Sequence, residues 1–224
     1  MKAGSGDSAE ARMALEALCR TYWDPLYAFV RRSGAAPEDA QDLVQGYIAT
    51  LLERRDFEKV APRFGRLRSF LLAGVKHFML NEWKRAARIK RGGGALHLPL
   101  DQESVENGLA SRACQNLAPD AIFDRRWALK VLDTVLLRIR SGSGVAGKPG
   151  LVQDLIPSML GESGARTYAE VAIRHGMSEA AVKMASQRLR ARFRECLKEE
   201  VCQTVCNQQE VENELRELIK ILRS

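Results

Sequence analysis

Apolar residues recur along this chain at intervals of three and four, which is the spacing of one face of an α-helix. No stretch alternates apolar and polar residues as a strand would. In the first half the pattern predicts helices over 10–32, 37–52 and 66–91, with Pro25 as a point where a second segment of the first helix begins. A turn is predicted at 33–36. The fold is therefore predicted to be all-α.

The second half of the chain begins after a glycine-rich break. The predicted order is a first domain at 8–91, a flexible linker at 92–118, a second domain at 119–200 and a C-terminal extension at 201–224. In the extension, apolar residues repeat at intervals of four, three and four: Val211, Leu215, Leu218 and Leu222. This repeat is too short for an independent coiled coil, so the short C-terminal helix is expected to dock on its own domain.

A helix-turn-helix is predicted over 167–183. Thr167 and Glu170 have the spacing of a capping box, which begins the first helix. Gly176 suits the left-handed conformation that ends a helix, and Ser178 is a natural N-cap for the next one. Two helices joined by such a turn are typical of proteins that enter the DNA major groove.

The second of these helices has one packing side and one basic side. At 100° per residue the packing side holds Val182, Ala185, Ser186, Leu189 and Phe193, while Val171 and Ile173 offer apolar surface on the first helix. The residues that are candidates for contacting bases or phosphates are Ser178, Lys183, Met184, Gln187, Arg188, Arg190 and Arg192. The alternative interpretation is a solvated basic helix in some other all-helical domain.

Positive charge is concentrated in two places. The net charge is +7, and positions 66–91 carry eight Lys or Arg against one acid, Glu82. Positions 167–198 carry seven against three, whereas 199–224 carry six acids and three bases. Two basic blocks suit a polyanion that is bound at two places.

Other classes of protein find little support. No run approaches the roughly 18 apolar residues of a membrane span, and the N-terminus lacks a signal-peptide core, so a cytoplasmic protein without a membrane partner is expected. The five cysteines are irregularly spaced. Cys202 and Cys206 could form a metal or redox site, and the alternative interpretation is that they are ordinary small apolar residues. The histidines lack metal-ligand spacing, and there is no phosphate loop. We therefore expect no metal, cofactor, small-molecule substrate or enzyme activity.

Taken together, these motifs resemble the extracytoplasmic-function sigma factors, the two-domain promoter-recognition subunits of bacterial RNA polymerase. The similar segments are 39–45, a helix that docks on the polymerase clamp, 67–85, which opens and reads the minus-ten element, and 168–197, which reads the minus-35 element. Finer motifs resemble a subgroup from bacterial genomes rich in serine/threonine kinases; among them are Asn81-Glu82-Trp83 and Arg125-Arg126-Trp127-Ala128. The expected partners are core RNA polymerase and promoter DNA.

The resemblance also implies roles for individual residues. Minus-ten contacts are expected from Arg66, Arg68, Lys76, His77, Asn81, Lys84, Arg85 and Arg88, and minus-35 contacts from the basic side of the second helix. Core polymerase is expected to meet Asp39, Asp42, Gln45 and Glu53. His77 and Asn81 are the candidates for unpaired bases, whereas Trp83 follows the apolar period and is expected in the core.

One position departs from the family. Many relatives carry a further acid after the motif glutamine, whereas Gln45 is followed here by Gly46, with Thr50 one turn on. A phosphate on Thr50, added by a serine/threonine kinase or controlled by another regulator, would restore negative charge. The alternative is that Thr50 is an unmodified helix residue.

A stand-alone helix-turn-helix regulator, acting without polymerase, is the main alternative function. It accounts for the C-terminal half but gives the basic block at 66–91 no purpose. Binding to core polymerase in the absence of DNA distinguishes the two.

Overall fold

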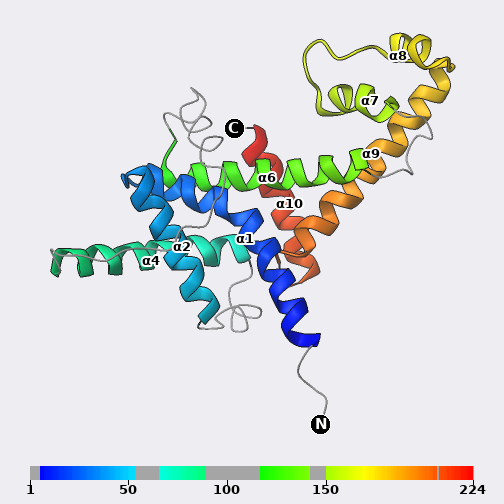
Figure 1. The fold of residues 1–224 in the computed structure, drawn as a ribbon. Helices are drawn as coiled ribbons and strands as arrows, with labels where there is room; N and C mark the ends of the chain where they lie inside the picture. Colours follow the sequence, from blue (N-terminus) through cyan, green and yellow to red (C-terminus); the bar gives the residue numbers. More distant parts are fainter. Residues whose placement is uncertain (1–5, 54–65, 89–116, 142–149, 206, 224) are drawn as a thin grey trace. The chain divides into compact units, whose positions relative to one another are not determined.

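The computed structural model describes residues 6–53, 66–88, 117–141, 150–205 and 207–223 (Figure 1). Within these ranges the regular structure is helical, apart from one isolated antiparallel bridge between Arg66 and Val205. The all-α prediction is confirmed. No helix in the described ranges combines the length and the apolar character that a membrane crossing requires.

The chain forms two compact units. Unit 1 comprises 1–130 and 204–224, and unit 2 comprises 131–203. These units differ from the predicted domain ranges in two places, because 119–130 and residues 204–224 of the C-terminal extension group with unit 1. The C-terminal helix, expected to dock on its own domain, packs within unit 1. The predicted linker lies outside the described residues except for its last two positions.

Unit 1 contains α1 (Gly6–Arg32), α2 (Pro37–Glu53), α4 (Leu67–Arg88), the first half of α6 (Pro119–Ser141) and α10 (Gln208–Arg223). The predicted turn between α1 and α2 is confirmed, but α1 continues through Pro25 and no second segment begins there. Pro25 is buried, as are Trp23 and Leu26, so packing of this stretch outweighs the hydrogen bond that a proline cannot donate.

The core of unit 1 forms where α1, α2, α4 and α6 meet. Its largest fully buried side chains include Tyr22, Tyr27, Leu71, Phe123 and Trp127. The phenolic oxygen of Tyr47 on α2 donates to the carbonyl of Leu71 on α4 at 3.1 Å. A Cβ atom at Gly74 would lie 2.2 Å from that oxygen, so this approach requires glycine.

Unit 2 contains the second half of α6, α7 (Leu151–Leu160), α8 (Tyr168–His175) and α9 (Glu179–Cys202). Its core contains the buried side chains of Val135, Leu151, Leu155, Val171, Val182 and Leu189. Arg138 of α6 forms ion pairs with Glu199 at 2.6 Å and Glu200 at 3.6 Å, which join α6 to the last turns of α9. The packing presents α8 and the first half of α9 as one helix-turn-helix.

Candidate nucleic-acid interface

The helix-turn-helix of unit 2 has the caps that the sequence predicts. The Glu170 amide donates to Thr167 Oγ1 at 3.3 Å, and the Thr167 amide donates to Glu170 Oε2 at 2.8 Å. This backbone hydrogen bond lowers the pKa of Glu170. Gly176 adopts φ +59°, and Ser178 Oγ accepts from the Ala181 amide at 3.2 Å. Each helix end is therefore fixed by its own residues.

The first half of α9 presents a polar and basic face. The predicted packing side is confirmed for Val182, Ala185, Ser186 and Leu189, which are buried, while Phe193 is half-buried. On the other side the exposed residues include Lys183, Met184, Gln187, Arg188, Arg192 and Arg194. Of the two apolar residues noted on the first helix, Val171 is buried, whereas Ile173 is 84% exposed and Ala172 is buried instead.

Several of the α9 cations have partners within unit 2. Lys183 Nζ lies 2.7 Å from Glu179, which raises the pKa of Lys183, and Arg192 lies 2.7 Å from Glu195. Exposed pairs of this kind are weak and exchange readily for phosphate. Arg190 is half-buried and its guanidinium lies 3.4 Å from the phenolic oxygen of Tyr168, so it joins α9 to α8. Gln187 and Arg188 are thus the best placed of the predicted base-reading residues.

Asp154 of α7 contacts the last turn of α8 in the helix-turn-helix. The sequence did not predict this contact. Its carboxylate lies 2.8 Å from His175 Nε2, 3.1 Å from Arg174 and 2.6 Å from Arg166. The hydrogen bond with His175 lowers the pKa of Asp154 most, and the two arginines lower it further against the opposing effect of burial. Because Arg174 and His175 form the last turn of α8, the carboxylate fixes α8 against α7.

Asp154→Asn is expected to destabilise unit 2 by about 1–3 kcal/mol at pH 7, because a neutral amide replaces the buried carboxylate that the two arginines and His175 contact. A lowered folded pKa means that the wild-type carboxylate contributes stability above its unfolded pKa of 3.8 and loses this contribution as the pH falls through the folded value. Hydrogen exchange of α8 between pH 3 and pH 7 measures both effects. Asp133→Asn, at an exposed position of unit 2, is the control. Equal protection in the two variants would contradict the role of Asp154.

A second basic face lies on α4 in unit 1. Its exposed residues are His77, Asn81, Lys84 and Arg85. At 100° per residue His77, Asn81 and Lys84 fall within about 60° of one another. Arg88 shares this direction in the helix, but its side chain lies outside the described part. This face can approach an extended polyanion.

Arg66, Arg68 and Lys76 are placed differently. Arg68, which was predicted to contact the minus-ten element, is 7% exposed and pairs with Glu214 and Asp124. Arg66 pairs with Glu210 at 3.3 Å, and Lys76 pairs with Asp120 at 2.7 Å and lies over the Phe29 ring. In this conformation these three cations pair with acidic residues of unit 1.

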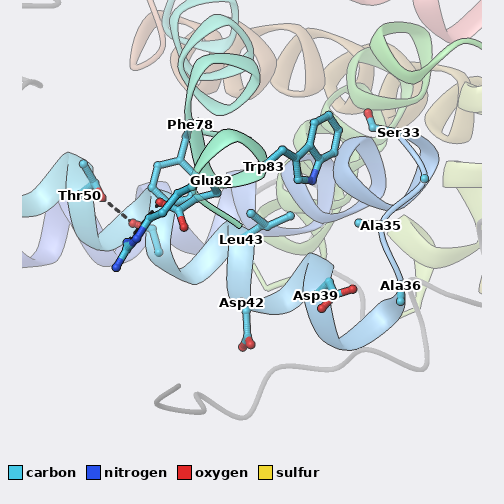
Figure 2. Close-up of a pocket in the computed structure, with 13 residues that line it drawn as sticks. Ser33, Ala35, Ala36, Asp39, Asp42, Leu43, Thr50, Phe78, Glu82 and Trp83 are labelled. Carbon is cyan, nitrogen blue, oxygen red and sulfur yellow. Dashed lines mark hydrogen bonds and ion pairs between the residues drawn. The ribbon is translucent and has the colours of Figure 1, made fainter. Parts of the chain in front are cut away.

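Trp83 is 46% exposed, so its predicted place in the core is wrong. It borders a pocket of about 750 Å³ between α2, α4 and the turn that joins α1 to α2. Figure 2 shows Phe78, Glu82 and Trp83 of α4 on one side of this pocket and Leu43 of α2 on the other. The pocket therefore combines an exposed indole with apolar walls and acidic side chains.

The predicted polymerase-binding residues lie on α2. Asp39 and Asp42 (Figure 2) are exposed. Glu53 is also exposed, and Gln45 is half-buried. A Cβ atom at Gly46 would lie 3.1 Å from the Phe78 ring, so this position faces α4 and offers little room for an acidic side chain.

Comparison of the chain with models of protein families, with curated proteins and with solved structures finds no match.

Proposed function

We propose that this chain is a sigma factor of bacterial RNA polymerase, of the extracytoplasmic-function type. It would have no catalytic activity of its own and would direct the core enzyme to promoters with two recognition elements. The observation that carries this proposal is the presence of two separate candidate DNA faces, on α9 of unit 2 and on α4 of unit 1. A stand-alone helix-turn-helix regulator uses only the first.

The two faces would act at different stages. The α9 face offers Gln187 and Arg188 to base edges of a duplex minus-35 element, with Lys183 and Arg192 near phosphates. The α4 face offers His77 and Asn81 beside cations, which suits bases that leave the stack when the minus-ten element melts. Reading one element as duplex and opening the other is the division of labour that a sigma factor needs.

Core polymerase would bind the acidic face of α2. Purified core enzyme and the full chain should form a complex in the absence of DNA, and Asp39→Lys with Asp42→Lys should weaken it at least tenfold. Glu212→Lys, on the exposed side of α10, is the control for the change of charge. A chain that binds promoter DNA but not core polymerase would instead be a stand-alone regulator.

His77→Ala and Asn81→Ala are expected to reduce promoter opening about tenfold while leaving closed-complex binding nearly unchanged. The reason is that a contact to an unstacked base, worth about 1–3 kcal/mol, forms only after melting. Permanganate reactivity of minus-ten thymines in the polymerase complex measures opening. Ser69→Ala, exposed on the same helix, is the control. Unchanged thymine reactivity in both variants would remove His77 and Asn81 from the proposal.

Regulation at Thr50 is a further part of the proposal, with a serine/threonine kinase as the partner. Thr50 Oγ1 donates to the Gly46 carbonyl at 2.8 Å, as an unmodified helical threonine does (Figure 2). A phosphate would add about −2 charge on the helix that carries Asp42 and Glu53. Thr50→Glu is therefore expected to bind core polymerase a few-fold more tightly than Thr50→Ala at low salt, with the difference shrinking at high salt. Equal affinities would leave Thr50 as an ordinary helix residue.

A further inference from the structure

The C-terminal helix α10 is held on unit 1 by acids that meet the first arginines of the basic block. Arg66 Nε lies 3.3 Å from Glu210 Oε2 and 3.2 Å from Glu214 Oε2. Arg68 forms a bidentate ion pair with Glu214, whose side chain is 1% exposed. The acids of α10 thus bind both arginines.

Backbone and apolar contacts complete this docking. The Leu67 amide donates to the Thr204 carbonyl at 3.0 Å, beside the bridge between Arg66 and Val205. Val211 and Leu218 of α10 are fully buried. The acceptor surface for α10 is therefore the start of α4, where the chain enters the basic helix.

Docking of α10 changes which cations of the basic block at 66–91 are exposed. His77, Asn81, Lys84 and Arg85 on α4 are exposed. Arg66 instead pairs with acids of α10, and Arg68 pairs with Glu214 of α10 and Asp124 of α6. Carboxylates of α10 occupy the positions where phosphate oxygens would bind, since arginine recognises both groups through the same paired N–H donors. Another anion can exchange with the ion pairs of this interface, unlike with its apolar contacts.

We propose that α10 is an intramolecular inhibitor that competes with nucleic-acid phosphates for Arg66 and Arg68. The inference rests on the proposed function, because it takes the basic block as a DNA-binding surface. With α10 docked, unit 1 binds DNA through the rest of the α4 face alone. When α10 leaves, Arg66 and Arg68 lose their Glu210 and Glu214 partners and become available to phosphates at the start of α4, while Arg68 keeps Asp124 as a partner.

The test compares two full-length variants of equal charge, without polymerase. Glu210→Gln with Glu214→Gln weakens the docking, whereas Glu212→Gln with Glu217→Gln removes two acids that do not contact Arg66 or Arg68. Affinity for a forked DNA with a single-stranded arm is measured across salt concentrations. For two additional phosphate contacts, the slope of log affinity against log salt should steepen by about 1.4 in the first variant only. Equal slopes in the two variants would overturn the inhibition.

Hydrogen exchange of the wild-type chain provides a second measurement that does not depend on the variants folding. Amides of α10 should lose protection when the forked DNA binds. Unchanged protection in the DNA complex would overturn the inhibition and leave the proposed function standing. A chain that binds no DNA in any variant would overturn the proposed function and the inhibition together.

Discussion

Glu214→Ala is expected to lower the free energy of unfolding of unit 1 by about 3–5 kcal/mol. The substitution leaves the Arg68 guanidinium in a buried position with Asp124 as its remaining carboxylate partner. Burial lowers the pKa of Arg68, but hydrogen bonds and charge attraction with Glu214 and Asp124 outweigh this effect and raise it. Its guanidinium also lies 4.8 Å from the centre of the Trp127 ring, where a cation-π contact holds it in place.

Urea denaturation followed by tryptophan fluorescence measures this loss, because Trp23 and Trp127 are buried in unit 1. Glu212→Ala, on the exposed side of α10, is the control and should cost less than about 0.5 kcal/mol. Replacing both charges, as Arg68→Met with Glu214→Leu, should recover most of the stability, since an apolar pair avoids the desolvation penalty. Similar losses for Glu214→Ala and Glu212→Ala would contradict a buried ion pair.

Gln187→Ala and Arg188→Ala are each expected to weaken binding to the minus-35 element by about 1–3 kcal/mol. Both side chains lie exposed on the α9 face, opposite the buried Val182 and Leu189. A base contact is lost only on the cognate sequence, so affinity for a scrambled duplex should change little. Loss of Gln187 should also relax the preference at one base pair.

Titration of cognate and scrambled duplexes at two salt concentrations tests this prediction. Arg192→Ala serves as the phosphate-contact control, and it should weaken both duplexes alike and reduce the salt slope by about 0.9. Equal losses on the two duplexes for Gln187→Ala and Arg188→Ala would show that α9 does not read bases.

Local signals in the sequence were sufficient for the helix-turn-helix. Thr167, Glu170, Gly176 and Ser178 act on backbone groups within three or four residues, so their spacing alone predicts the helix ends. The all-α fold likewise follows from the repeat of apolar residues at helical spacing.

Tertiary contacts account for the failures. Arg68 lies three residues before Leu71 and seven before Val75, so it falls within the apolar stripe of α4, and Glu214 falls between Val211 and Leu218 in the same way. A charge inside each stripe was a usable signal, but the pairing joins residues 146 positions apart. Asp154 gave no comparable signal, because its three partners come together only when α8 packs on α7.

Exposure of apolar residues was predicted poorly for a related reason. The apolar period of α4 continues to Trp83, whereas among the described residues burial on this helix ends at Met79. Periodicity shows which residues share a side of a helix, and only the neighbouring helices decide how far along that side is covered.

Run-off transcription with purified core RNA polymerase tests the central claim most directly. On a library of promoter fragments, core enzyme together with this chain should produce defined transcripts that core enzyme alone does not produce. Their templates should share an upstream and a minus-ten element. A chain that binds fragments of this library yet yields no transcript with core enzyme from any of them would contradict the assignment as a sigma factor.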